Sequence, residues 1–259
     1  MKNEIAKVLS IAGSDSSGGA GIQADLKTMS ALGVYGMTVI TAVTAQNTTG
    51  VRGVHILPPE MVKKQMDAVF EDIPPDAVKI GMLADCTIMQ VVAERCENYR
   101  VKNLVLDPVM VATSGARLMQ ENAGEFLTQV LFPKASLITP NIPEAQCLLG
   151  SEESSPEMLS RELYERYGVP FLVKGGHNDS DVSDALFLEG RNIRFETKRL
   201  DNPNTHGTGC TLSSAIACGL AKGMGLEESI RYAKAYIAKT IAFGLDLGAG
   251  SGPLYHNVS

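Results

Sequence analysis

Short apolar segments alternate with amphipathic segments along most of the chain. Runs of roughly four to eight residues rich in Val, Ile, Leu and Thr are typical of buried strands. Such runs occupy residues 8–12, 38–45, 77–80, 103–106, 136–139 and 170–173. Helical spacing is clearest at residues 22–32, 58–70, 210–222 and 226–244. Residues 184–188 and 193–197 are expected to pair as a hairpin across the turn at 189–192.

Repeated strand–helix units predict an α/β fold, with a mostly parallel central sheet and helices on both faces. The chain has 259 residues, of which 44% are hydrophobic, so it can bury a full core. Its prolines and glycines are scattered, and no linker or low-complexity run divides it. We therefore expect one domain over residues 1–259.

Polar, glycine and proline residues follow the predicted strands. Ligands of parallel α/β sheets bind beyond the carboxyl ends of the strands. We therefore expect seven strand ends to converge on one site, at residues 13–15, 46–48, 81–82, 107–108, 140–141, 174–176 and 204–209.

The segment His206-Gly207-Thr208-Gly209-Cys210 stands at the predicted start of a helix of small residues. A helix start offers N–H groups without intrahelical partners and the positive end of the helix dipole. Glycines there let a phosphate approach the backbone. The same position favours a thiolate, so we expect the pKa of Cys210 to lie below its free value of about 8.5. The alternative is an ordinary strand-to-helix turn with a structural thiol.

Two common nucleotide-binding motifs are absent. Residues 13–18 have the glycine spacing of a P-loop, but Gly19 and Ala20 stand where Lys and Ser or Thr are required. No GxGxxG sequence stands at a strand-to-helix turn. P-loop and dinucleotide-binding functions are therefore disfavoured.

The composition narrows the choice of partners. The formal net charge is −6 and no basic patch is visible, which argues against nucleic acid and anionic membranes. No long apolar stretch or signal-peptide pattern is present, so we expect a cytoplasmic protein. The odd number of cysteines and the lack of a CxxC pair disfavour disulfides and structural zinc. We interpret Cys86, Cys96, Cys147 and Cys218 as core residues.

Several motifs together resemble the hydroxymethylpyrimidine/phosphomethylpyrimidine kinases of thiamine biosynthesis, a family of the ribokinase-like superfamily. The motifs are AGSDSSGGAGIQADLKT from Ala12, AQNT from Ala45, KIGML from Lys79, LDPVM from Leu106, TPNIPEA from Thr139, KGGH from Lys174 and HGTGCTLS from His206. The resemblance implies a three-layer sandwich, a homodimer, and ATP- and Mg²⁺-dependent phosphorylation of 4-amino-5-hydroxymethyl-2-methylpyrimidine to its monophosphate and then its diphosphate.

The resemblance also implies roles for individual residues. Gly207, Thr208, Gly209 and Cys210 match the anion hole and the catalytic position, where many ribokinase-like enzymes have Asp as a base. The pyrimidine ring is expected to contact Gly13, Asp25, Gln46, Met82 and Val109. ATP is expected to contact Asn141, Lys174, Thr205, Gly207 and Gly209, and the metal Asp107 and Glu144.

The chemistry of these side chains agrees with those roles but leaves alternatives open. The amide of Gln46 has both a donor and an acceptor, as an aminopyrimidine edge requires. Asp25 could instead be an exposed charge, and Met82 and Val109 plain core residues. Asn141 and Glu144 have the spacing of a helix capping box, which is compatible with metal binding.

Three other functions remain to be weighed. The first is a pyridoxal or pyridoxine kinase, or an enzyme of dual specificity. The second is a catalytically silent ligand-binding protein on the same fold. The third is a carbohydrate kinase, which leaves the residue Gln46 unexplained. We assign no catalytic role to His206 or His177, because a loop histidine is more often a hydrogen-bonding spacer.

Overall fold

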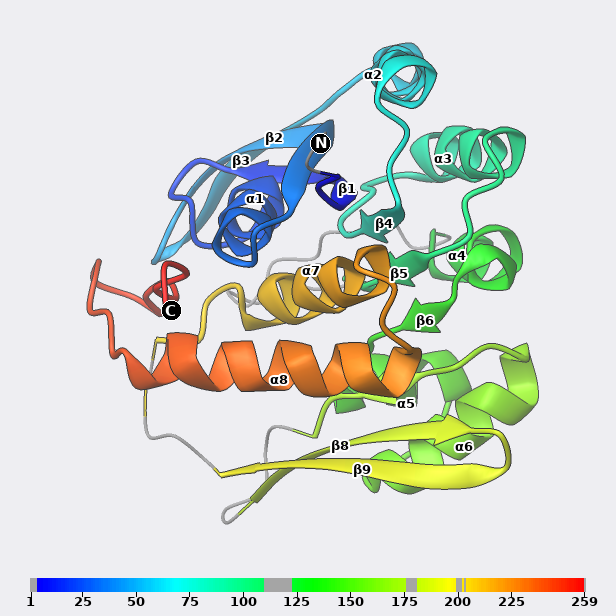
Figure 1. Ribbon diagram of the computed structural model, residues 1–259, viewed down its shortest axis with the longest axis vertical. Coiled ribbons are helices and arrows are strands. Elements are labelled where there is room, and N and C mark those ends of the chain that lie inside the picture. The colour runs from blue at the N-terminus through cyan, green and yellow to red at the C-terminus, as the bar shows by residue number, and fades with distance from the viewer. Residues whose placement is uncertain (1–3, 110–122, 176–180, 199–201, 203, 259) are drawn as a thin grey trace.

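A six-stranded sheet forms the centre of the computed structural model, which describes residues 4–109, 123–175, 181–198, 202 and 204–258 (Figure 1). Its strands are β1 (Lys7–Asp15), β2 (Tyr35–Asn47), β3 (Gly50–Ile56), β4 (Ala77–Ile80), β5 (Leu104–Leu106) and β6 (Leu137–Ile138), in the order β3-β2-β1-β4-β5-β6. All neighbours pair in parallel except β3, which is antiparallel to β2. The predicted mostly parallel sheet is confirmed.

A second sheet continues this arrangement beyond β6. It consists of β7 (Leu172–Val173), β8 (Asp181–Leu188) and β9 (Arg191–Lys198), all antiparallel. Parallel bridges between Ile138 and Phe171 and between Asn141 and Lys174 place β7 beside β6. The predicted hairpin is present with a shorter turn than expected, because Glu189 and Gly190 both have positive φ and make a two-residue connection.

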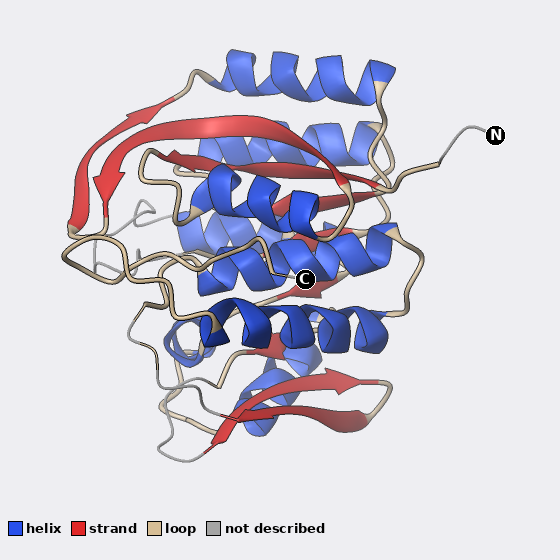
Figure 2. Cartoon of the chain, turned by 60° about the vertical axis from the view of Figure 1, so that its left-hand side comes forward, coloured by secondary structure: helices blue, strands red, loops and turns tan. Residues whose placement is uncertain are grey.

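Helices cover both faces of the sheet (Figure 2). They are α1 (Gly21–Ala31), α2 (Pro59–Asp72), α3 (Cys86–Asn98), α4 (Ala123–Val130), α5 (Ile142–Leu149), α6 (Pro156–Tyr167), α7 (Thr208–Ala221) and α8 (Leu226–Ala242), with a short 3₁₀ helix, η1 (Phe132–Lys134). One apolar core lies between the sheet and α2 to α6, and the other packs against α1, α7 and α8. Successive side chains of β4 point to opposite faces of the sheet, so Val78 and Ile80 contribute to the first core and Ala77 contributes to the second. The predicted three-layer architecture is confirmed.

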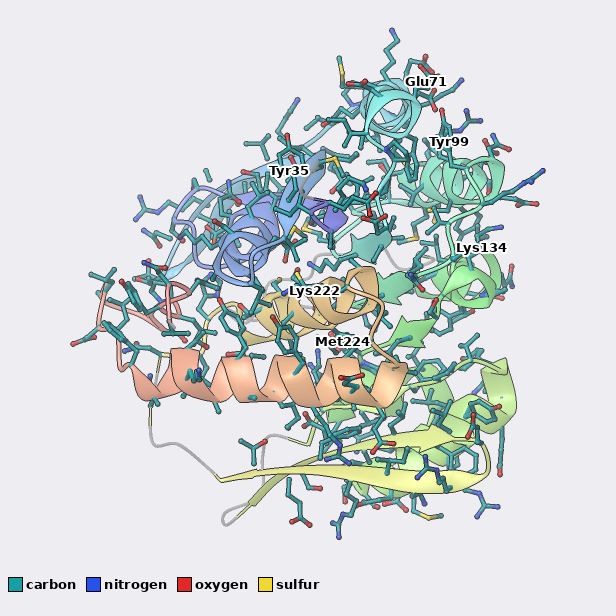
Figure 3. The ribbon with its side chains drawn as sticks, viewed as in Figure 1. Tyr35, Glu71, Tyr99, Lys134, Lys222 and Met224 are labelled. Atoms are coloured by element: carbon teal, nitrogen blue, oxygen red, sulfur yellow. The ribbon has the colours of Figure 1, made fainter. Side chains whose placement is uncertain are left out.

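Side-chain contacts at the surface tie neighbouring helices together (Figure 3). Lys222, just after α7, donates a hydrogen bond to the carbonyl of Leu32 at the end of α1. Tyr99 stacks on Phe70 with the ring centres 4.5 Å apart, which joins α3 to α2.

Some sequence-based expectations need correction. Strand β3 was not expected, because its side chains are mostly exposed and form no continuous apolar run. Cys96 and Cys218 are buried as predicted, and Cys86 is partly buried. Cys147 is exposed, so its interpretation as a core residue is wrong; helix α5 buries Ala145 and Leu148 instead. Within the described part of the chain, no helix is both long enough and apolar enough to span a bilayer.

Candidate active site

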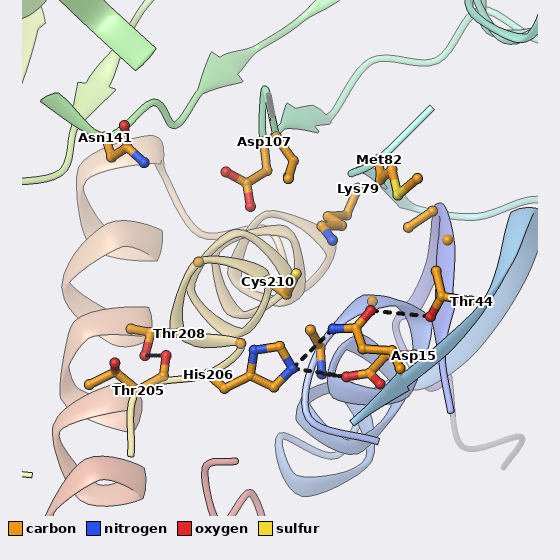
Figure 4. Close-up of a pocket in the computed structure, with 18 of the residues that line it drawn as sticks. Asp15, Thr44, Lys79, Met82, Asp107, Asn141, Thr205, His206, Thr208 and Cys210 are labelled. Atoms are coloured by element: carbon orange, nitrogen blue, oxygen red, sulfur yellow. Dashed lines mark hydrogen bonds and ion pairs between the residues drawn. The ribbon is translucent and has the colours of Figure 1, made fainter. Parts of the chain in front are cut away.

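A cavity of about 400 Å³ lies at the carboxyl ends of the parallel strands (Figure 4). Each of the seven predicted strand-end segments contributes at least one residue to its lining. All the predicted site residues line it except Asp25. The predicted convergence on one site is therefore confirmed, while the roles of the individual residues stay predictions.

Helix α7 begins at the floor of this cavity. Gly207 is its N-cap residue with φ of 85°, and Cys210 lies in the first turn. A side chain added at Gly209 would begin 3.4 Å from both Asp107 Oδ2 and Lys174 Nζ. The first backbone N–H groups of a helix have no intrahelical partner. An anion at Gly209 would thus meet free donors next to a lysine and a carboxylate.

We expect Gly207→Ala to destabilise the fold strongly. A side chain at Gly207 would be forced into a left-handed conformation and would collide with the carbonyl of Gly19. Strain of this kind alone costs about 1–3 kcal/mol, and the collision adds to it. Gly33→Ala is the matched control, because Gly33 has φ of 66° with open space around it. Urea unfolding should show a clearly larger loss for Gly207→Ala; equal losses would contradict the predicted collision.

An ion pair joins the two charged residues above the helix start. Lys174 Nζ lies 3.1 Å from Asp107 Oδ1, and Thr139 donates a hydrogen bond to the same oxygen. Burial alone would lower the pKa of Lys174, but the carboxylates of Asp107 and Glu144 outweigh it and raise that pKa. The lysine is therefore a fixed cation at the place where the resemblance predicts ATP.

The loop after β6 forms the predicted capping box. The side chain of Asn141 accepts a hydrogen bond from the backbone N–H of Glu144, and Glu144 Oε2 accepts one from the N–H of Asn141. Both residues also line the cavity. The capping interpretation is thus confirmed, and it holds the carboxyl group of Glu144 at the cavity wall.

The thiol of Cys210 differs from our expectation. Burial raises its pKa, and although the nearby Lys79 ammonium lowers it, the carboxylates of Asp25 and Asp107 raise it further, to about 11. The prediction of a lowered pKa is therefore wrong for the protein without ligands. The helix start favours a thiolate, but desolvation and two negative neighbours have the larger effect.

Asp25 does not reach the cavity. Its side chain is fully buried, and its two oxygens lie 3.0 Å and 2.9 Å from Lys79 Nζ. Ser10 and Ser214 donate further hydrogen bonds to it. The expected contact between Asp25 and the pyrimidine ring is therefore corrected: Asp25 holds Lys79, which lines the cavity beside Cys210 (Figure 4).

Three titratable residues of the cavity lining were given no role from the sequence: Asp15, Lys79 and His206. Asp15 accepts hydrogen bonds from the backbone N–H groups of Ser17, Gly19 and Ala20. His206 Nε2 lies 3.0 Å from Asp15 Oδ2. A signal for Lys79 was present, because a lysine within the apolar run 77–80 requires a buried partner.

Sequence comparison shows that the chain is similar to known enzymes. Residues 15–255 match the family profile described as phosphomethylpyrimidine kinase. A bifunctional thiamine biosynthesis protein of Geobacter sulfurreducens is 50% identical over 96% of this chain and 52% of its own length. The hydroxymethylpyrimidine/phosphomethylpyrimidine kinase of Salmonella typhimurium is 47% identical over 96% of each chain. The chain therefore spans about half of the bifunctional relative and nearly all of the shorter one.

Solved structures agree on the fold. A phosphomethylpyrimidine kinase of Clostridium difficile has a TM-score of 0.81 and 45% identity, over 91% of this chain and 99% of that chain. A Bacillus subtilis pyridoxal kinase in complex with ADP has a TM-score of 0.90 and 34% identity, over 98% of both chains. With the profile match over nearly its whole length, the chain belongs to the phosphomethylpyrimidine kinase family and is an ATP-using kinase of the ribokinase-like fold.

Proposed function

We propose that the protein transfers the γ-phosphoryl group of ATP to the hydroxymethyl group of 4-amino-5-hydroxymethyl-2-methylpyrimidine. A second transfer to the resulting monophosphate gives the diphosphate, which is a step of thiamine biosynthesis. The names of the Salmonella and Clostridium relatives support this assignment.

The single observation that carries the proposal is the division of the cavity into two ends with Cys210 between them (Figure 4). Asn141 and Thr205 lie at one end, and Met82 and Thr44 lie at the other. We assign the first end, with Lys174, to the phosphates of ATP, because a lysine and a helix start stabilise phosphate oxygens. We assign the second end to the ring.

The start of α7 would then hold the phosphoryl group in transit. Phosphoryl transfer depends mainly on positioning and on neutralisation of charge, which backbone N–H groups and a lysine supply. Cys210, at the same turn, would receive the proton of the substrate hydroxyl as the new O–P bond forms. Its pKa of about 11 makes the thiolate a strong base that is present in a small fraction at neutral pH.

The cavity also fits a magnesium ion. Asp107 and Glu144 are carboxylates on the wall next to Lys174, and Mg²⁺ prefers oxygen ligands while it keeps several waters. We propose that these two residues hold the ion, directly or through water. Bound there, the ion would neutralise charge on the phosphates.

Pyridoxal is the second candidate substrate. The fold of the Bacillus subtilis pyridoxal kinase agrees with this chain at a TM-score of 0.90, although the sequence identity is lower than with the pyrimidine kinases. Backbone similarity therefore does not separate the two activities. Gln46 favours the aminopyrimidine, because its amide matches an amine next to a ring nitrogen.

We further propose that the chain acts as a single cytoplasmic kinase domain, residues 1–259, in a homodimer. Val54 and Ile56 are exposed on the same side of β3 and would be covered by a second copy. Sedimentation equilibrium tests the dimer; a monomer at micromolar concentration would contradict it.

The function is tested by offering ATP with the pyrimidine and with pyridoxal in parallel and resolving the products by mass. We expect mono- and diphosphorylated pyrimidine, at a kcat/KM at least about tenfold above that for pyridoxal, because one matched hydrogen-bonded edge discriminates by about that factor. Phosphorylated pyridoxal alone would refute the assignment. A monophosphate that is never converted to the diphosphate would refute the second step only.

A further inference from the structure

The side chain of Gln46 is held between two polar neighbours at the ring end of the cavity. Its backbone is fixed first, because Ser16 Oγ donates to the Gln46 carbonyl and accepts from its N–H. In Figure 4 the amide oxygen Oε1 lies 3.1 Å from Thr44 Oγ1 and the amide nitrogen Nε2 lies 3.4 Å from His206 Nε2. The nitrogen and oxygen of a carboxamide have nearly the same shape, so its neighbours decide which end is which.

The carboxylate of Asp15 determines the proton on His206. Burial would raise the pKa of Asp15, but hydrogen bonds from His206, Ser17 and Ala20 lower it to about 2. Asp15 is therefore ionised and only accepts hydrogen bonds. The Nε2 atom of His206, 3.0 Å from Asp15 Oδ2, must then carry a hydrogen. The end of the Gln46 amide that faces this N–H must accept, so we assign the oxygen Oε1 to that end, which turns the amide by half a turn from the arrangement in Figure 4.

The hydroxyl of Thr44 leads to the same orientation independently. It lies 2.8 Å from the carbonyl oxygen of Ser14 and 3.1 Å from the Gln46 amide, and we assign its single hydrogen to the shorter contact with Ser14. Thr44 Oγ1 is thus left as an acceptor for Gln46. The end of the amide that faces Thr44 must be the nitrogen Nε2. Two neighbours that share no atoms therefore require the same arrangement of the Gln46 side chain.

We propose that Asp15 and His206 are specificity-determining positioning residues that, with Thr44, lock the amide of Gln46 in one orientation. The inference deepens the proposed function, on which it rests. Asp15 and Gln46 both contact His206 Nε2, so the one hydrogen on that atom is shared between them (Figure 4). After these bonds, the Gln46 amide keeps one N–H hydrogen and one oxygen lone pair for a ligand in the cavity.

This fixed order of donor and acceptor selects the ring. An aminopyrimidine offers a ring nitrogen that accepts and, next to it, an amine that donates. Gln46 satisfies both only when its N–H meets the ring nitrogen and its oxygen meets the amine. At the corresponding edge pyridoxal has a phenolic oxygen and an aldehyde oxygen, and when the phenol is ionised both are acceptors. The locked amide then leaves one of them facing an oxygen, which costs binding energy.

The packing around His206 leaves its ring little freedom. The ring is mostly buried, and a side chain at Gly19 would collide with it. The neighbouring Gly207 continues directly into the start of α7. The imidazole is therefore held by packing as well as by Asp15, as a residue that orients another one must be.

The test is a double-mutant cycle on ligand binding. The probe is 4-amino-2,5-dimethylpyrimidine, which has no hydroxyl group and so binds without reacting. By calorimetry we expect His206→Phe and Thr44→Val each to weaken its binding about tenfold, as for loss of one hydrogen bond. His206→Phe in a Gln46→Ala background should cause almost no further loss, because His206 acts through Gln46. KM for ATP should change less than about threefold, within what surface substitutions cause.

His55→Phe is the matched control, since His55 is exposed on β3 and is not among the residues that line the cavity. Thermal unfolding of each variant verifies that it is folded. Independent, multiplying effects of His206→Phe and Gln46→Ala would overturn the positioning role, as would equal losses for the probe and for ATP.

The same measurements separate this inference from the proposed function. If the wild-type protein binds the probe but does not phosphorylate the hydroxymethylpyrimidine, the proposed function is refuted. The double-mutant cycle on probe binding then still tests the positioning role. Wild-type protein that does not bind the probe refutes both. Phosphorylation by the wild type with normal probe binding in His206→Phe refutes the positioning role alone.

Discussion

Cys210→Ala should lower kcat by about 100-fold to 10,000-fold, which is the usual contribution of a positioned acid or base. KM for ATP should change little, because the backbone N–H groups of the helix start and Lys174 remain in place. Steady-state kinetics with both substrates measures the effect. Near-normal turnover by a folded variant would show that Cys210 only fills space.

The pH dependence of kcat/KM also tests the assignment of Cys210 as the base. The pKa of the Cys210 thiol is raised to about 11. Below that pH, the thiolate fraction of the free enzyme increases about tenfold for each unit by which the pH rises. We expect kcat/KM to rise with pH between about 7 and 10 in the wild type. Cys210→Asp, the carboxylate found in many related kinases, should remove this slope. A slope that persists in Cys210→Asp would mean that another group is responsible.

Lys79→Met should destabilise the protein by about 3–5 kcal/mol, the typical result of removing one partner of a buried ion pair. Lys79 and Asp25 are both completely buried, so the remaining carboxylate would stay in the interior without its counter-ion. The free energy of unfolding in urea measures the loss. A loss below about 1 kcal/mol would contradict this prediction, because it is the value typical of solvent-exposed ion pairs.

The double variant Lys79→Met with Asp25→Asn separates stability from catalysis. The asparagine oxygen still accepts from Ser10 or Ser214, and no unpaired charge remains, so we expect recovery of most of the lost stability. Activity should be low, because the lost Lys79 ammonium lowers the pKa of Cys210 by more than the lost Asp25 carboxylate raises it. Recovery of both properties would contradict a role for Lys79 in the reaction.

Much of the fold could be predicted from the chain because buried parallel strands carry an unmistakable apolar pattern. The run at β4 was located to the residue, and the hairpin of β8 and β9 was recognised from its turn. Strand β3 was missed because it lies at the sheet edge with exposed side chains, and its pairing with β2 rather than its own pattern makes it a strand.

The location of the candidate site could be predicted from the sequence more reliably than the pKa values of its residues. Strand ends must meet, so Gly13, Gln46 and Lys174 were placed together by topology alone. The pKa of Cys210 depends on burial and on Asp25 and Asp107, which only the packed structure brings near it. Asp25 illustrates the same limit, because Gly21 at the start of α1 lines the cavity whereas Asp25, four residues later, is fully buried.

The ion pair between Lys174 and Asp107 has a consequence for how the cavity admits ligands. Each charge is the other's counter-ion, and Asp107 is almost fully buried. An anion that draws Lys174 away leaves Asp107 without its ion-pair partner, and a cation that draws Asp107 away leaves Lys174 with Glu144 as its remaining carboxylate neighbour, so each exchange alone is costly. Arrival of the two together replaces both partners at once. With ATP and Mg²⁺ bound as proposed above, we expect either one alone to bind more weakly than the two together.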